Sequence, residues 1–251
     1  MAKGISIRIG TSGWMYNHWQ RIFYPDKWPK SKWLEYYAGQ FDTVELNASF
    51  YRLPNPKTFK GWKERTPDNF LWSVKASKFI THIRRLKDPA EPLSRLYNSI
   101  TGLGEKLGVI LFQLPPSLSF DEKVFIDFCG SLDPNLRYAL EIRHPSWINS
   151  RVSAVLSEFN MALCISDTAG RYPSSEAITA DFVYIRLHGP RSLYASEYSE
   201  EELRVWAEKV IDWNKNAFIY FDNDFEGHAI KNARRLKEIL IDFSEGNFMP
   251  L

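Results

Sequence analysis

Short apolar runs, rich in β-branched and aromatic residues, recur eight times along the 251-residue chain. Their length and composition are typical of β-strands, and the residues between them are more polar. We therefore predict strands at residues 5–10, 41–46, 70–76, 108–114, 137–142, 161–166, 182–187 and 217–222.

Most segments between these runs carry apolar residues at the 3.6-residue spacing of amphipathic helices. The clearest is residues 199–216, SEEELRVWAEKVIDWNKN, which opens with a serine suited to an N-cap and an acidic first turn. Residues 168–181 are short and rich in Ser and Pro, so we expect at most a turn or two of helix there. Further helices are predicted within residues 25–40, 88–104, 121–132, 153–160 and 227–243.

A strand followed by a connecting segment, repeated eight times in a chain of this length, is the pattern of a (β/α)₈ TIM barrel. The alternative α/β fold, a doubly wound open sheet, usually shows a GxGxxG fingerprint after its first strand. The corresponding segment here reads GTSGW (residues 10–14). Because no linker or low-complexity tract divides the chain, we predict a single TIM-barrel domain over residues 1–251.

Composition changes this picture little. A net charge of +2 neither requires nor excludes a polyanionic partner, so only a local basic cluster could argue for one. No apolar run is long enough for a membrane span, and the N-terminal residues lack the layout of a signal peptide. The two cysteines, Cys129 and Cys164, show no metal-ligand spacing and are expected to be buried thiols. We therefore expect a cytoplasmic protein without a membrane partner.

The alternation of side chains along each strand predicts which residues face the barrel interior. On the second strand, Val44 and Leu46 are expected to contact the helices, which turns Glu45 inward. The same alternation, applied to four strands, predicts two groups of inward side chains. Small ones lie low in the barrel, and ionisable ones lie at the carboxyl-terminal ends of the strands. The other inward residues are Thr43, Asn47, Ser73, Lys75, Ser77, Ala139, Glu141, Arg143, Tyr184, Arg186 and His188.

The carboxyl-terminal end of the strands carries the active site in nearly all characterised barrel enzymes. The backbone amides of the turn at residues 10–13 could cradle an anion there. From these arguments we predict four catalytic candidates: Glu45, Glu141, His188 and Lys75. We also predict the substrate-binding residues Arg143, Arg186, Asn47, Gly10, Thr11, Ser12, Trp14, Gln113, Asp222 and Asn223.

A purely structural interpretation stands beside this one. Charged groups buried in a barrel need partners whether or not they have a function. Glu141 with Arg186, or Glu45 with Lys75, could be such stabilising ion pairs. The convergence of the whole set on one end of the barrel favours a functional pocket.

Seven short motifs, in order along nearly the whole chain, resemble the YecE-like family, also called domain of unknown function 72. They are IGTSGW (9–14), VELNASFYRLP (44–54), WSVKASKFITH (72–82), LFQLPP (111–116), EIRHPSW (141–147), YIRLHG (184–189) and YFDND (220–224). The resemblance implies a TIM barrel and supplies no activity. Two residues depart from the family pattern: Ile142 stands where Phe is usual, and Asp222 where Asn is usual.

The first functional hypothesis is an enzyme, such as a hydrolase or lyase, that acts on a phosphate- or carboxylate-bearing substrate. The planar guanidinium of arginine is suited to bidentate binding of an oxyanion, so Arg143 and Arg186 could bind the phosphate or carboxylate of the substrate. Glu45 and Glu141 could serve as acid or base, and His188 could shuttle a proton near neutral pH. Lys75 could act as a nucleophile if it is desolvated beside a cation.

The second hypothesis is a metal-dependent phosphodiesterase or isomerase, with carboxylates and histidine at the strand ends holding a divalent ion. The ligands would be Glu45, Glu141, Asp167, His188 and Asp222. Against it, three cationic side chains share the same end of the barrel, whereas metal sites gather anionic or neutral ligands. No nucleotide-binding fingerprint or other cofactor signal is evident.

The third hypothesis is nucleic-acid binding without catalysis. Residues 75–87, KASKFITHIRRLK, contain five Lys or Arg residues, one His and no acidic residue. Basic residues mixed with aromatic ones suit contacts to a nucleic-acid backbone together with base stacking. The loop at residues 14–24 adds several aromatic side chains, which we expect to pack the loop onto the barrel.

Overall fold

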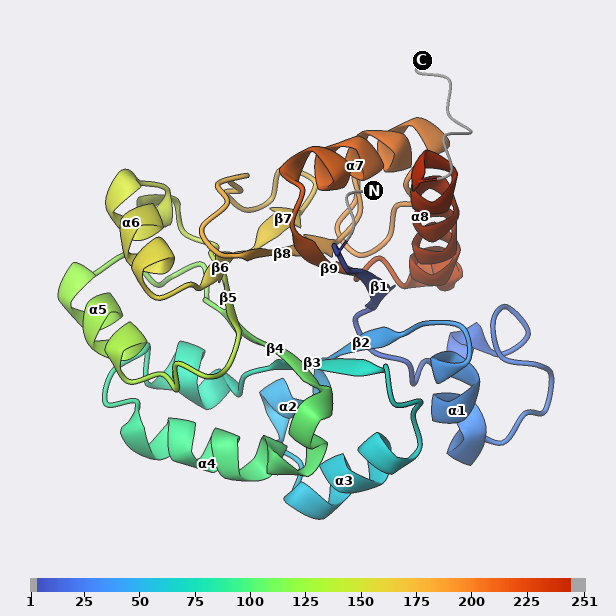
Figure 1. The fold of residues 1–251 in the computed structure, drawn as a ribbon, viewed down its shortest axis with the longest axis horizontal. Helices are drawn as coiled ribbons and strands as arrows, with labels where there is room; N and C mark the ends of the chain where they lie inside the picture. The colour runs from blue at the N-terminus through green and yellow to red at the C-terminus, as the bar shows by residue number, and fades with distance from the viewer. Residues whose placement is uncertain (1–3, 245–251) are drawn as a thin grey trace.

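The computed structural model describes residues 4–244, and within them parallel strands form a ring enclosed by helices (Figure 1). Each predicted strand run contains a strand, and their bounds agree to within two residues. The strands are β1 (Ile7–Thr11), β2 (Thr43–Leu46), β3 (Leu71–Lys75), β4 (Leu107–Gln113), β5 (Tyr138–Glu141), β6 (Ala162–Leu163), β7 (Ile165–Asp167), β8 (Phe182–Leu187) and β9 (Asn216–Phe221).

The hydrogen-bonded ladders form two parallel sheets, in the orders β1-β9-β8-β7 and β2-β3-β4-β5-β6. The sheets meet at two places. β6 and β7 are the two halves of the predicted sixth strand, separated at Cys164, whose N–H donates to the Leu140 carbonyl of β5 over 2.9 Å. At the other junction Gly10 packs so closely on β2 that a Cβ there would lie 2.2 Å from the Thr43 carbonyl oxygen. Together the sheets make a TIM-barrel-like α/β fold, as predicted.

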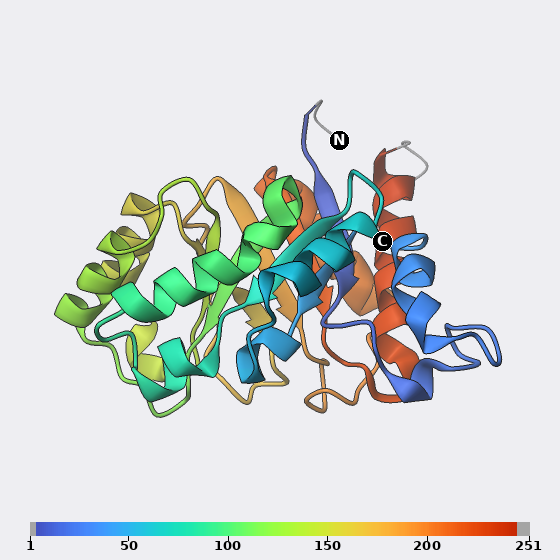
Figure 2. The ribbon, with the colours of Figure 1, turned by 90° about the horizontal axis from the view of Figure 1, so that it is seen from below.

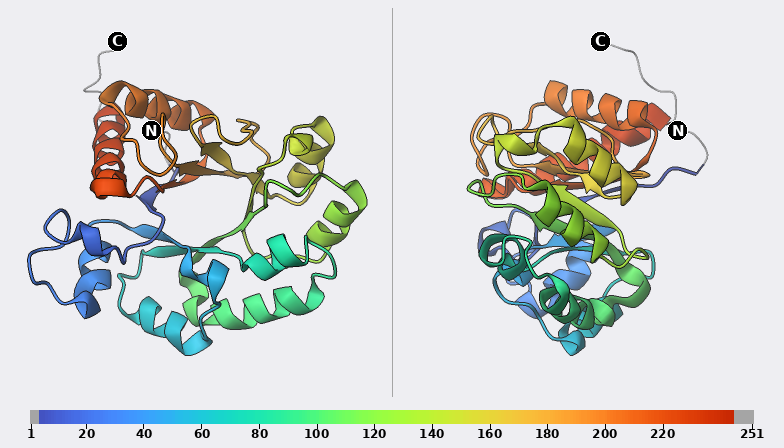
Figure 3. Two further views of the ribbon diagram at one scale, coloured as in Figure 1. Left: turned by 180° about the vertical axis from the view of Figure 1, so that it is seen from behind. Right: turned by 90° about the vertical axis from the view of Figure 1, so that its left-hand side faces the viewer.

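Helices follow most strands and cover the outside of the ring, as the views from behind and from the side show (Figure 3). α2 and α3 were not predicted, whereas residues 168–181, where at most a turn or two of helix was expected, contain no helix. The helices are α1 (Trp33–Ala38), α2 (Ala48–Tyr51), α3 (Pro56–Glu64), α4 (Ala90–Ile100), α5 (Glu122–Gly130), α6 (Ser150–Glu158), α7 (Glu200–Trp213) and α8 (His228–Ser244).

Apolar side chains fill two separate layers. The larger lies between strands and helices and contains the residues predicted to face outward, including Val44, Leu46 and Trp72. The smaller lies inside the ring and includes Leu111, Ala139, Tyr184 and Tyr220, among others. The inward residues beyond this inner layer are at the carboxyl-terminal ends of the strands, so ionisable groups lie above an apolar interior.

β1 begins and α8 ends at the same side of the molecule, which is the amino-terminal side of the strands (Figure 2). The carboxyl-terminal ends of the strands and their loops therefore lie on the opposite side, away from the start of β1 and the end of α8. Within residues 4–244, every helix falls short of the length or apolarity that crossing a membrane requires.

Candidate functional site

A fully buried guanidinium, that of Arg186 on β8, joins three carboxylates from three other strands. Its Nε lies 3.1 and 3.0 Å from the two carboxylate oxygens of Glu45, and its Nη1 lies 2.5 Å from Oε2 of Glu141. Its Nη2 donates to Glu45 Oε1 over 2.8 Å and to Asp222 Oδ2 over 2.9 Å. Charge-assisted bonds of this kind are the strongest that side chains form. We call these four residues the arginine–carboxylate cluster.

The cluster forms because parallel strands bring inward side chains to the same height. Glu45 is on β2, Glu141 ends β5, and Asp222 directly follows β9. Glu45 also accepts hydrogen bonds from Ser12 Oγ over 2.8 Å and from the Tyr184 hydroxyl over 2.6 Å. The predicted inward orientation of the acidic residues is therefore confirmed, and the predicted Glu141–Arg186 pair is present.

The electrostatics of the cluster favour the ionised forms of Glu141 and Asp222. Burial opposes ionisation of Glu141, but the positive charges of Arg186 and Arg143 outweigh it and hold the pKa of Glu141 well below its usual range. The pKa of Asp222 is also lowered: burial opposes its ionisation, and Arg186 and His188 favour it. Burial acts against the charge of Arg186, yet Glu45 and Glu141 raise its pKa well above the ordinary value.

His188, on the same face as Arg186, is fully buried beside the cluster. Its Nε2 lies 3.4 Å from Nη1 of Arg186, which can only donate, so Nε2 faces the guanidinium with its lone pair. The proton then belongs on Nδ1, 3.0 Å from Asp222 Oδ2, although the two are not aligned as a hydrogen bond. The ring edge also contacts Tyr194, with ring centroids 5.4 Å apart. Asp222 thus orients His188 electrostatically.

Lys75 ends β3 next to the cluster but is not part of it. Its Nζ donates to Gln113 Oε1 over 2.8 Å and lies 4.5 Å from the centre of the Phe50 ring. In the described part of the chain no carboxylate forms an ion pair with Lys75, so the Glu45–Lys75 pair considered above is absent. Burial, followed by the charge of Arg186, lowers the pKa of Lys75 to about 8.

Arg143 connects the cluster with the loops around it. Its Nε donates to Glu141 Oε1 over 2.9 Å, and its Nη2 lies 2.8 Å from the same oxygen as an ion pair. Its guanidinium lies 4.5 Å from the centre of the Tyr172 ring. Burial and the charges of Lys75 and Arg143 lower the pKa of His82, which shows that this histidine lies in a positive field. The outer part of the site is therefore cationic, although its inner part is rich in carboxylates.

The predicted anion cradle at residues 10–13 is wrong, because its amides already have acceptors within the protein. The Thr11 amide donates to the Tyr37 hydroxyl, and the Ser12 amide donates to the Phe221 carbonyl, both over 2.9 Å. The Gly13 amide donates to the carbonyl of Thr11 over 3.0 Å. Gly10 serves the close approach of β1 to β2 instead of ligand binding. Of this turn, only the Ser12 side chain reaches the site.

Three other predicted binding residues take structural positions or remain apart from the cluster. Trp14 packs edge-on against Trp72 in the outer core, with ring centroids 5.3 Å apart. Asn223 is buried and donates from Nδ2 to the carbonyl of Ser196 over 2.9 Å. Asn47 has a buried Oδ1 without a hydrogen-bond partner in residues 4–244. Arg186 was also predicted to bind substrate. Each nitrogen of its guanidinium already contacts a carboxylate, so the side chain has no free donor for a ligand.

Comparisons with known proteins now give these features a family context. The family model described as "Protein of unknown function DUF72" matches residues 8–247. The chain belongs to this family. It is 25% identical to the UPF0759 protein YunF of Bacillus subtilis, over 95% of this chain and 96% of that relative. It is 26% identical to the UPF0759 protein YecE of Escherichia coli K12, over 85% of this chain and 84% of that relative.

Solved structures of DUF72 proteins have the same fold. A crystal structure from Thermotoga maritima aligns with a TM-score of 0.84 at 29% identity, over 94% of this chain and 99% of that one. Another, from Enterococcus faecalis, aligns with a TM-score of 0.82 at 19% identity, over 98% and 97% of the two chains. The family resemblance inferred from the short motifs is therefore confirmed.

In this DUF72 chain, sequence reasoning missed the aromatic and histidine side chains that surround the cationic groups. Tyr184 was placed inward but was not counted as a site residue, although alternation alone puts it below Arg186. Phe50, His82, Tyr172 and Tyr194 come from loops or short helical turns. No strand periodicity applies to such segments, so nothing in the local pattern marks them.

The basic stretch of residues 75–87 lies partly next to the site. Its middle is a π-helical turn, Phe79–Ile83, with Lys78 and Arg84 exposed on either side. Arg84 pairs with Asp88 over 3.5 Å, and Arg85 donates to the Ser117 carbonyl over 2.7 Å. The predicted packing of the aromatic loop at residues 14–24 is confirmed, since Trp14, Trp19 and Tyr24 are buried. Nucleic-acid binding stays a prediction.

A metal site would have to use the carboxylates that surround Arg186. Among the described residues, no group of three or more His, Cys, Asp or Glu side chains is arranged to hold a metal ion. The guanidinium of Arg186 lies between the three carboxylates, where an ion would have to bind. The sequence-based expectations about metal and cofactor use stay predictions.

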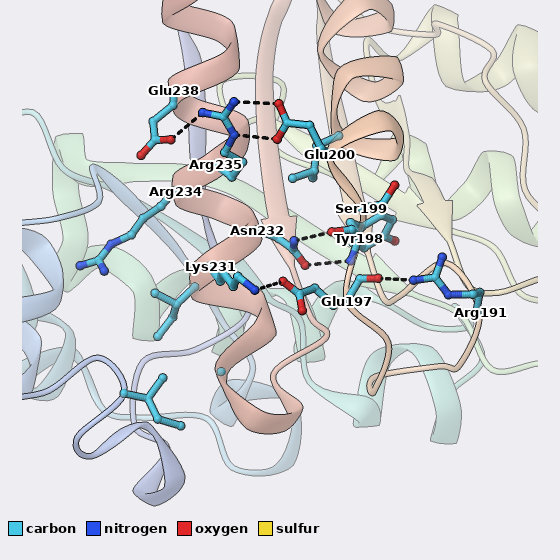
Figure 4. Close-up of a pocket in the computed structure, with 14 residues that line it drawn as sticks. Arg191, Glu197, Tyr198, Ser199, Glu200, Lys231, Asn232, Arg234, Arg235 and Glu238 are labelled. Carbon is cyan, nitrogen blue, oxygen red and sulfur yellow. Dashed lines mark hydrogen bonds and ion pairs between the residues drawn. The ribbon is translucent and has the colours of Figure 1, made fainter.

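A separate groove of about 800 Å³ lies between α7 and α8 (Figure 4). Its charged side chains largely pair with one another: Arg235 binds Glu200 over 2.7 Å, and Lys231 lies 2.5 Å from Glu197. None of the residues predicted for the site lines this groove. Because its charges are mutually compensated, it offers less to a charged ligand than the barrel end does.

Proposed function

We propose that the protein is an enzyme that acts on a small phosphate- or carboxylate-bearing substrate at the carboxyl-terminal end of its strands. One observation carries this proposal: the cations of the site are unequally paired. Arg186 is surrounded by three carboxylates, whereas Lys75 donates to the neutral amide oxygen of Gln113. A cation at a partly exposed position without a carboxylate partner is suited to an anionic ligand.

Each group then has a distinct role. Lys75, at the end of β3, and Arg143, just after β5, bind the anionic group of the substrate from two sides. Glu141, which is held ionised, holds the guanidinium of Arg143 through a hydrogen bond from Nε and an ion pair with Nη2. His188, held beside Asp222, is assigned to proton transfer. Arg186 positions the carboxylates and does not contact the substrate.

Inorganic phosphate binding, followed by calorimetry and thermal unfolding, tests this assignment. We expect phosphate to bind the wild-type protein and to raise its unfolding temperature, as any ligand of the native state does. Lys75→Gln and Arg143→Gln should each weaken binding by about tenfold or more, since a hydrogen bond to a charged group contributes roughly 1.5–3 kcal/mol.

The matched control is Lys123→Gln, which removes an exposed lysine of α5 that pairs with Asp127. It should bind phosphate as the wild type does. Equal binding by all four proteins would contradict the assignment of the anion site. A panel of phosphomonoesters and carboxylates, assayed with the wild type and Arg143→Gln, would then test for turnover at the same site.

A further inference from the structure

Lys75 has the surroundings of a reactive amine. It is the last residue of β3, faces the interior of the strand ring, and lies with its Nζ over the Phe50 ring. Its hydrogen-bond acceptor is Gln113 Oε1, which is neutral. An amide oxygen accepts a hydrogen bond from a neutral amine as well as from an ammonium ion. Lys75 can therefore lose its proton and keep its position.

Burial and the charge of Arg186 favour that loss and outweigh the opposing charges of the three carboxylates. The three carboxylates that would stabilise an ammonium ion, those of Glu45, Glu141 and Asp222, are occupied by Arg186. Burial and the positive charge of Arg186 lower the pKa of Lys75 to about 8. Compared with an ordinary lysine of pKa near 10.4, roughly a hundredfold more of Lys75 is unprotonated near neutral pH. Desolvation beside another cation is a known way to activate a lysine as a nucleophile.

We propose that Lys75 forms a covalent imine with a carbonyl group of the substrate, and that the substrate is an oxo acid or a carbonyl compound bearing a phosphate. This inference rests on the proposed function and changes one role in it. Arg143 still holds the anionic group of the substrate, whereas Lys75, which also contacts that group in the proposed function, bonds to the carbonyl carbon. With Lys75 bound to the carbonyl carbon, the guanidinium of Arg143 is the remaining cation of the outer site. The inference also explains why Lys75 has no carboxylate partner in the described residues.

The reaction balances without any further reagent. The lone pair of Nζ forms a C–N bond to the carbonyl carbon, and the π electron pair of C=O moves to oxygen, which takes up one proton. Nitrogen loses one proton, and the resulting hydroxyl group takes up another and leaves as water while the C=N bond forms. The nitrogen then gives up its second proton, so that two protons leave nitrogen and two reach oxygen. One amine and one carbonyl compound thus give one imine and one water.

Reductive trapping tests the imine directly. The full chain is incubated near neutral pH with pyruvate or dihydroxyacetone phosphate, and borohydride then reduces any imine to a stable secondary amine. Intact mass and peptide mapping should show one adduct on the peptide that contains Lys75, with the mass of the probe less water plus two hydrogen atoms. We expect labelling of Lys75 to exceed that of exposed Lys123 roughly a hundredfold.

The controls separate nucleophilicity from folding and from anion binding. Lys75→Arg keeps a cation of similar length and should fold, yet it should show no specific adduct. Lys123→Arg should be labelled at Lys75 as the wild type is. Acetone, a carbonyl compound without an anionic group, should label Lys75 far less than pyruvate does. Equal labelling by acetone would overturn the assignment of an anionic carbonyl substrate.

Failure of this inference is distinguishable from failure of the proposed function. If phosphate binds in a Lys75- and Arg143-dependent manner but Lys75 is labelled no more than Lys123, the imine is overturned and the anion site stands. If phosphate binding is unaffected by both substitutions, the anion site is overturned, and with it the substrate class named here. Specific labelling of Lys75 by pyruvate and by dihydroxyacetone phosphate, lost in Lys75→Arg, supports the imine and the anion site together.

Discussion

At the scale of single residues, the charge of Arg186 is what allows three carboxylates to be buried together. Glu45 and Glu141 are fully buried, and Asp222 is only 14% exposed. Without the guanidinium, each carboxylate would lose its main cationic partner in a medium that solvates charge poorly. Lys75 lies outside this arrangement, and its Nζ donates to Gln113 Oε1.

Replacing Arg186 with Met should therefore destabilise the protein strongly. Breaking a buried ion pair by removing one partner typically costs about 3–5 kcal/mol, and here three carboxylates lose one partner. Urea unfolding measures the free energy of unfolding. The control is Arg21→Met, which breaks the exposed pair with Asp26 and should change stability by about 1 kcal/mol or less. Similar losses in the two variants would show that the cluster contributes little.

At the scale of elements, the loop between β8 and α7 positions the aromatic ring beside His188. Gly189 begins this loop with a φ of +112°, and a Cβ there would lie 2.6 Å from the carbonyl oxygen of Ser192. Further along, the backbone amide of Tyr194 donates to the carbonyl of His188 over 2.5 Å. α7 then starts with a capping box between Ser199 and Glu202. The loop is thus constrained at both ends, which holds Tyr194 against the site.

Gly189→Ala should destabilise this loop, because it adds both a disfavoured φ and a backbone clash. We expect a loss of more than about 1 kcal/mol in thermal or urea unfolding. Gly61→Ala is the matched control: Gly61 is inside α3, and a Cβ there meets no atom within 4 Å. That substitution should stabilise the protein by about 0.5–1 kcal/mol. A neutral Gly189→Ala would mean that the loop adjusts freely.

The strands were predictable because each combines apolar β-branched residues with a clear alternation of inward and outward sides. The elements between them were harder. The helix predicted in residues 25–40 is a 3₁₀ turn (Lys30–Lys32) followed by the short α1, and α3 escaped prediction altogether. Such connections follow the available space around the ring, so their local pattern is weaker than that of a buried strand.

At the scale of the whole molecule, the site exists only because the ring of strands is assembled. Its carboxylates lie at residues 45, 141 and 222, and they share one guanidinium from residue 186. No pair of these residues is close in sequence. Unfolding therefore separates the charges and returns Glu141 and Asp222 to ordinary pKa values.

Global stability should accordingly fall in acid. The pKa values of Glu141 and Asp222 are lower in the folded protein than in the unfolded chain, so the unfolded chain binds more protons at acidic pH. Their contribution is present above the unfolded values of about 4 and is lost as pH falls below them. Urea midpoints from about pH 7 to 3 should decline less in Glu141→Gln, measured relative to its own value at pH 7. Parallel declines would contradict the linkage.

The sequence by itself determined which side chains face the interior, because alternation along a strand depends only on backbone geometry. It thereby placed Glu45, Lys75, Glu141 and Arg186 in one region. What only the tertiary structure decided is how these charges pair. Arg186 takes all three carboxylates, Lys75 is left with Gln113, and the amides of residues 10–13 are used within the fold. These partners depend on how distant strands align when the ring forms, which no local pattern encodes.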